Sequence, residues 1–182
     1  MGFCVPRRVT RAWLPLLLLP LISCGGSREP PSSPSVNPMG TWKGTNTVSS
    51  ATPASHCVAG LLRAAFSAPQ PATLTVTAQG AVVSVKSAND LTGTSCDYIG
   101  QISASGEITA TLERCSIPGL TGIVCADGLV RDIRISGGRV AVQVSGNQMT
   151  GTESGNYEVS LSPSGAPDGS LTISSTIRVT RQ

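Results

Sequence analysis

The chain has 182 residues, with 13 Lys or Arg, 10 Asp or Glu and a formal net charge of +3. Three arginines, Arg7, Arg8 and Arg11, lie within residues 1–23, so the remaining residues hold ten basic side chains (13 less these three) against ten acidic ones. This balance leaves no basic stripe and excludes a nucleic-acid-binding surface. Only 3% of residues are aromatic and 13% are charged, a composition that favours a β protein with tight turns.

The first 23 residues have the pattern of an export signal. The three arginines precede an apolar run from Trp13 to Ile22 that contains two prolines. The run is about half the roughly 20 residues that a membrane-spanning helix needs, which favours a secretory signal over a spanning helix.

The residues Leu21-Ile22-Ser23-Cys24 resemble the lipobox of bacterial lipoproteins. The resemblance implies that residues 1–23 are removed and that Cys24 carries a diacylglycerol, which anchors the chain to a membrane. Gly25 replaces the aspartate that favours inner-membrane retention, so the outer membrane of the cell envelope is expected. An ordinary signal peptide with an unmodified Cys24 is the alternative. Residues 24–39, rich in Pro and Ser, are expected to form the lipidated tether.

Residues 40–182 are expected to form one domain, which begins with a strand at Gly40-Thr41-Trp42. This start resembles the first strand of small β-barrels of the lipocalin and avidin type. A helical pattern interrupts the strands between residues 52 and 66, where Thr52 can cap and Pro53 fits the first turn. The apolar residues then recur on one face of a short helix, which is expected to lie on the barrel. They are Val58, Leu61, Leu62, Ala65 and Phe66.

From Ala72 onward, apolar and polar residues alternate with period two between closely spaced turns, which are expected at 79–80, 89–90, 105–106, 137–138 and 146–147. Residues 149–161 read as one long strand. The pattern predicts an all-β fold, an antiparallel up-and-down barrel of eight or nine strands with one short helix between the first two. A β-sandwich is the alternative. Because the outward positions are Thr, Ser, Lys, Glu and Arg, a lipid-facing barrel wall is not expected.

Four cysteines remain beside Cys24, and an even number in an exported chain favours two disulfides. They are Cys57, Cys96, Cys115 and Cys125. Long spacings, no CxxC and a single histidine argue against a metal site. A two-residue turn at 105–106 would set Cys96 opposite Cys115. The same register would place Ile102 on the face of Thr109 rather than on the apolar face of Ile108. A bulge at Gly106 repairs the faces and weakens that alignment. Two connectivities therefore stay open: 57–125 with 96–115, and 57–96 with 115–125.

No catalytic residue is expected. His56 lies between Ser55 and Cys57, whose side chains point away from it, so it is interpreted as an exposed helix residue. Seven acidic residues of the expected domain are scattered, with no pair at acid–base spacing on one face, and no cofactor motif is present. They are Asp97, Glu107, Glu113, Asp127, Asp132, Glu153 and Glu158.

Four larger side chains are candidates for lining a ligand site: Trp42, Tyr98, Arg131 and Tyr157. Arg131 shares the inward parity of Leu129, Ile133 and Ile135. It either holds a carboxylate ligand, pairs with an acidic residue at the barrel rim, or lies outside a strand that starts later. The three aromatic residues either line a cavity or fill the core.

The whole pattern, including Val-Ser-Gly-Asn-Gln-Met-Thr-Gly-Thr at 144–152, resembles bacterial lipoproteins with a tethered lipocalin-like barrel. We expect a non-enzymatic protein without cofactor that binds a small apolar or amphiphilic ligand in the barrel. The alternative is a structural or protein-interaction module with a filled barrel. The volume of the interior separates the two, because a ligand needs an empty space of a few hundred cubic ångströms.

Overall fold

The computed structural model describes residues 36–89, 91–116 and 120–182. The expected signal peptide, Cys24 and most of the expected tether lie outside these residues. Within the part of the chain that the structure describes, no helix is long and apolar enough to cross a bilayer.

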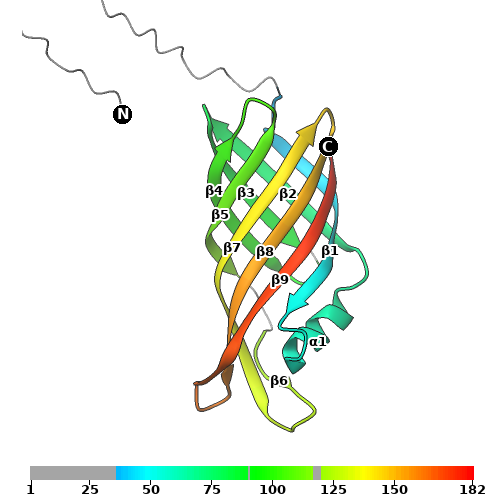
Figure 1. The fold of residues 1–182 in the computed structure, drawn as a ribbon. Helices are drawn as coiled ribbons and strands as arrows, with labels where there is room; N and C mark the ends of the chain where they lie inside the picture. The colour runs from blue at the N-terminus through cyan, green and yellow to red at the C-terminus, as the bar shows by residue number, and fades with distance from the viewer. Residues whose placement is uncertain (1–35, 90, 117–119) are drawn as a thin grey trace, which may run out of the picture. The chain divides into compact units, whose positions relative to one another are not determined.

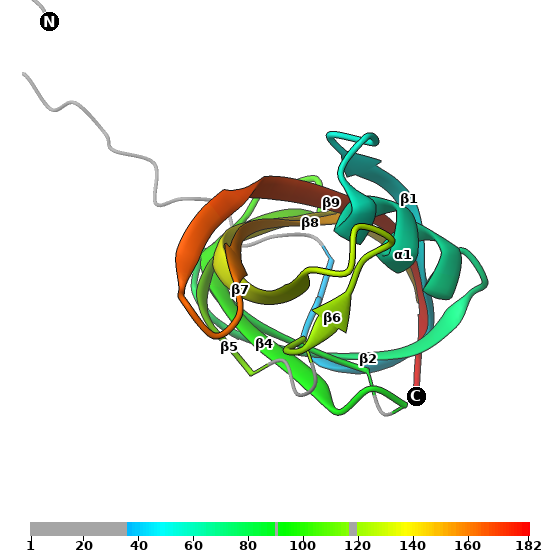
Figure 2. The ribbon, with the colours of Figure 1, turned by 90° about the horizontal axis from the view of Figure 1, so that it is seen from below.

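The described residues form a closed antiparallel β-barrel with one short helix (Figures 1 and 2). The strands are β1 (Gly40–Thr52), β2 (Gln70–Gln79), β3 (Val82–Asn89), β4 (Thr94–Ile102), β5 (Glu107–Ser116), β6 (Ile123–Val124), β7 (Val130–Ser145), β8 (Gln148–Leu161) and β9 (Ala166–Arg181). Their order is β5-β4-β3-β2-β1-β9-β8-β7-β6, and pairing between β5 and β7 closes the barrel. Eight strands form the wall, while the two-residue β6 pairs with the start of β7. The predicted all-β barrel is confirmed, and the sandwich alternative is wrong.

Helix α1 (Cys57–Ala65) follows β1, as predicted, but its details differ from the prediction. The N-cap is His56 rather than Thr52, because residues 53–56 first form a turn in which the His56 N–H donates to the Pro53 carbonyl over 3.2 Å. The buried face contains Val58, Ala59 and Leu62, whereas Leu61 is 47% exposed. The real apolar face is therefore rotated away from Leu61.

The turn expected at residues 137–138 does not exist, because β7 runs unbroken through both glycines. Gly138 lies opposite Gly155 of β8, and a Cβ at Gly138 would lie 2.9 Å from the Ser154 carbonyl oxygen. A register shift between Ile135 and Gly137 marks a bulge in β7. The glycine pair thus permits a bulge and a close approach of the two strands. Consecutive glycines are also typical of turns, so the sequence pattern is the same in both cases.

The cysteines pair as Cys57–Cys125 and Cys96–Cys115. Along most of the β4–β5 hairpin the register places Ile102 opposite Ile108, which keeps both inside the barrel. The register then shifts between Asp97 and Tyr98, so Cys96 comes to lie opposite Cys115. The bulge therefore lies far from Gly106, and both the inward faces and the cysteine alignment are satisfied.

The inward side chains divide the barrel into two halves. The filled half, at the end away from α1, holds a continuous core in which Trp42, Val83, Ile108 and Met149 are fully buried. We call the other half the helix half; a second, smaller core there joins α1 to the long ends of β7, β8 and β9. Figure 2 views the barrel from this end, where α1 and β6 lie at the opening.

Residues just before β1 pack on the end of the filled half. Val36 contacts the main core, and the Trp42 Nε1–H donates to the Pro38 carbonyl over 3.0 Å. The Arg181 guanidinium lies over the Trp42 ring, 4.6 Å from its centroid, and donates to the Asn37 carbonyl. Val36, Asn37 and Pro38, near the end of the expected tether, therefore pack against the folded domain.

Candidate ligand-binding cavity

A cavity of about 390 Å³ lies inside the helix half, between the two cores. Its lining comes from α1, from β1 to β4 and from β7 to β9. The volume falls in the range of about 300–1,000 Å³ that small-molecule sites occupy. The helix half of the barrel is therefore hollow enough to admit a ligand, whereas the other half is filled by side chains.

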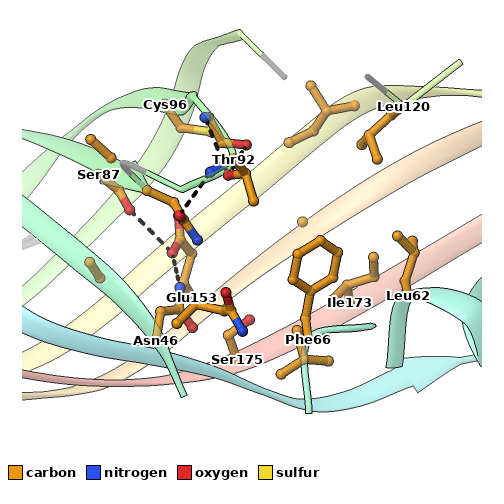
Figure 3. Close-up of a pocket in the computed structure, with 18 of the residues that line it drawn as sticks. Asn46, Leu62, Phe66, Ser87, Thr92, Cys96, Leu120, Glu153, Ile173 and Ser175 are labelled. Atoms are coloured by element: carbon orange, nitrogen blue, oxygen red, sulfur yellow. Dashed lines mark hydrogen bonds between the residues drawn. The ribbon is translucent and has the colours of Figure 1, made fainter. Parts of the chain in front are cut away.

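One wall of the cavity is polar and centres on Glu153 of β8 (Figure 3). Its Oε2 accepts hydrogen bonds from Asn46 Nδ2 at 2.8 Å and from Ser87 Oγ at 3.3 Å. Its Oε1 accepts a hydrogen bond from the Tyr98 hydroxyl at 2.5 Å. The donors come from β1, β3 and β4, so strands from across the barrel hold this carboxyl group in place.

Burial raises the pKa of Glu153, and the three hydrogen bonds oppose that rise because they favour the charged form. Burial and the neighbouring carboxylate also raise the pKa of Tyr98, and the same two causes raise that of Tyr157 to about 12. Both phenols therefore stay protonated at neutral pH. Among the described residues that line the cavity, none is Lys, Arg or His, so these residues supply no cation for Glu153.

The opposite wall is apolar. Leu62 of α1 and Phe66, the C-cap residue, face Ile173 of β9 and Leu120 (Figure 3). Gly155 makes room for the Tyr157 ring at the cavity wall, since a Cβ there would lie 2.7 Å from that ring. The cavity thus combines an apolar wall near the helix with a polar wall deeper in the barrel.

The four residues predicted to line a ligand site lie in different parts of the barrel. Tyr98 and Tyr157 line the cavity. Trp42 does not; its side chain is fully buried in the filled half. The register of β1 explains this, because Trp42 lies one inward layer beyond Gly44 and two beyond Asn46, which is the β1 residue at the cavity's polar wall.

Arg131 is buried but lies outside the cavity lining. Its guanidinium makes two hydrogen bonds to Asp127, at 2.9 and 2.7 Å, and its Nε donates to Asp168 Oδ2 at 2.5 Å. The guanidinium lowers the pKa of Asp127 to about 2. Of the three interpretations of Arg131, pairing with acidic residues therefore holds, and Arg131 lies within β7 rather than before it.

His56 also differs from its sequence interpretation as an exposed residue. Its Nδ1 accepts a hydrogen bond from the Val58 N–H at 3.3 Å, its Nε2 lies 3.5 Å from Asp168 Oδ2, and its side chain is only 15% exposed. It therefore fixes the start of α1 beside the charged group of Arg131, Asp127 and Asp168, which we call the Arg131 cluster. The described residues contain no group of three or more side chains suited to binding a metal.

Sequence reasoning missed the residue at the centre of the polar wall, since Glu153 was grouped with the scattered acids. A signal was present: Glu153 shares the parity of Met149, Tyr157 and Val159, which are inward on the same strand. An acidic residue in an apolar row is costly unless it serves a site or is paired.

No protein-family model, curated protein or solved structure matches this chain. The residues of the cavity are therefore the guide to function.

Proposed function

We propose that this chain is a non-enzymatic lipoprotein of the bacterial cell envelope that binds a small apolar or amphiphilic ligand inside its barrel. The observation that supports ligand binding is the cavity of about 390 Å³, with its apolar wall at α1 and its polar wall at Glu153. Sites for small molecules are mostly apolar concave spaces with a few placed polar groups, and this cavity fits that description.

The proposed membrane anchor rests on the lipobox-like residues that end at Cys24. Diacylglycerol on that cysteine would hold the barrel at the membrane, with the outer membrane favoured by Gly25. The test is labelling with a fatty acid in a diderm bacterium. Label on the wild type and its absence from Cys24→Ser would support the anchor, whereas an unlabelled wild type would contradict it.

The second candidate is a structural or protein-interaction module, which needs no ligand and was expected to have a filled barrel. Only the half around Trp42 matches that expectation. The empty space in the helix half favours the first candidate.

Native mass spectrometry tests ligand binding. The chain from residue 25 is exported to an oxidising compartment and purified without detergent. It contains all residues of both cores and both cysteine pairs. A reproducible adduct of small-molecule mass that is released on denaturation supports the carrier. A bare mass that persists after incubation with lipid extracts contradicts it and favours the interaction module.

A further inference from the structure

We propose that the cavity selects amphiphiles with a protonated amine, whose ammonium group pairs with Glu153 while the chain lies against Phe66 and Leu62. This inference rests on the proposed function and deepens it, because it names the ligand's chemical class. The observations that carry it are the position of a carboxyl group in the cavity wall and the absence of a cationic side chain among the described lining residues.

The hydrogen bonds around Glu153 fit its charged form. Asn46 Nδ2 can only donate, and each carboxyl oxygen of Glu153 accepts at least one hydrogen bond. A carboxylate offers about four acceptor positions, and three are occupied here, so one remains for a ligand. A ligand that donates to this position completes the set of bonds that the protein begins.

Charge makes the preferred donor a cation. A buried carboxylate is costly unless it is paired, and the groups that bond to Glu153 (Asn46, Ser87 and Tyr98) are neutral. Tyr157 is the other titratable group that lines the cavity, and it too is neutral because its pKa is about 12. An ammonium group would therefore supply the charge that the cavity lacks.

The geometry also orients the ligand. Glu153, Asn46 and Ser87 form one wall, while Phe66, Leu62 and Ile173 form the wall that α1 contributes to (Figure 3). A head group at Glu153 thus leaves an alkyl chain in contact with apolar side chains. A short single-chain amine satisfies both walls at once.

The test compares three probes of equal chain length: decylamine, decanol and decanoate. Their binding is measured by calorimetry on the exported chain and on Glu153→Gln, with Glu158→Gln as the matched control, because Glu158 is on the same strand but exposed. The wild type and Glu158→Gln should bind decylamine roughly tenfold or more tightly than decanol, given the usual strength of a charged hydrogen bond. Glu153→Gln should lose that preference, and decanoate should bind the wild type most weakly.

The outcomes separate the two proposals. If decanol or decanoate binds as tightly as decylamine, the ligand-carrier function stands and the selection of amines is overturned. Amine selection that survives in a folded Glu153→Gln also overturns it. If none of the three probes binds at any pH tested, the carrier function itself is contradicted for single-chain amphiphiles, and amine selection falls with it.

A second measurement on the wild type covers the case in which Glu153→Gln fails to fold. An alkylamine stays protonated across the acidic and neutral range, as a lysine of pKa about 10.4 does. Acidification that protonates Glu153 should therefore weaken decylamine binding and leave decanol binding unchanged. Decylamine and decanol affinities that change in parallel with pH overturn the inference.

Discussion

The two halves of the barrel are built from the same strands, with the same inward–outward alternation, yet one is filled and the other is hollow. In the filled half the inward positions hold branched, sulfur-containing and aromatic side chains such as Ile108, Met149 and Trp42. One or two layers along the same strands, the inward positions are Asn46, Glu153 and Ser175. Small and polar residues at a few inward positions are therefore enough to open a cavity without changing the strand pattern.

The comparison also shows how the hollow half is supported. The filled half is held by contacts across the barrel, whereas the helix half depends on α1, the Cys57–Cys125 disulfide and the Arg131 cluster. The helix, the disulfide and the ion pairs stabilise this end of the barrel without occupying the space inside it.

The two disulfides should differ in their contributions to stability. Replacing Cys57 and Cys125 with Ala removes a link across 68 residues, which the chain-entropy relation values at about 4 kcal/mol. Replacing Cys96 and Cys115 removes a link across 19 residues, valued at about 3 kcal/mol. Urea unfolding of both double variants measures the losses, and hydrogen exchange should show faster opening of α1 only in the first. A larger loss of stability in the variant without Cys96 and Cys115 would contradict the view that the helix half depends on the Cys57–Cys125 disulfide.

Truncating an inward aliphatic side chain should cost more in the filled half. Leu74→Ala removes a fully buried side chain from a packed core and should lower the free energy of unfolding by about 3 kcal/mol. Ile173→Ala removes one that borders existing empty space, so its loss should be smaller by about 1 kcal/mol or more. Thermal and urea unfolding with the disulfides intact check this. Equal losses would mean that the cavity wall is as tightly packed as the core.

Enlarging an inward side chain should also cost more stability in the filled half than at the cavity. Ala110→Leu overpacks the filled half and should destabilise the protein by about 1–3 kcal/mol. Ser175→Leu adds similar bulk in the cavity and should change stability by less than about 1 kcal/mol while weakening ligand binding. Unfolding and native mass spectrometry on the two variants give both readouts. A Ser175→Leu protein that keeps full ligand binding would place the ligand elsewhere.

The fold could be predicted from the sequence because period-two alternation and the helical spacing of residues 58–66 are local signals. The turn at 137–138 could not be told from a bulge, since glycine serves both turns and close strand approach. The cysteine pairing depended on a register shift beside Tyr98, which leaves no mark in the alternation. Local patterns therefore predict the helix and the strands, and the register between strands decides which residues lie opposite one another.

The candidate site was less predictable for the same reason. Alternation shows that Trp42, Tyr98 and Tyr157 point inward, but the stagger of the strands decides which layer each one occupies. Tyr98 and Tyr157 lie at the cavity, while Trp42 lies in the filled core. Glu153 was detectable by parity alone, although the three donors that hold it come from strands distant in sequence.

The smallest expected effect concerns the cost of keeping Glu153 in the cavity of the ligand-free protein. Because its pKa is raised on folding, the folded state binds more protons than the unfolded state between the unfolded pKa of about 4.3 and the raised one. Stability should therefore fall as pH rises through that window. Glu153→Gln lacks this titration, so its stability relative to wild type should improve with rising pH across the window and level off above it. Unfolding curves at several pH values measure this difference, with Glu158→Gln, at an exposed residue of the same strand, as the matched control. A Glu153→Gln protein that loses stability relative to wild type as pH rises would mean that the bonds from Asn46, Ser87 and Tyr98 outweigh burial. The carboxylate would then be a stabilising element of the barrel, and the hollow half would owe part of its stability to its polar wall.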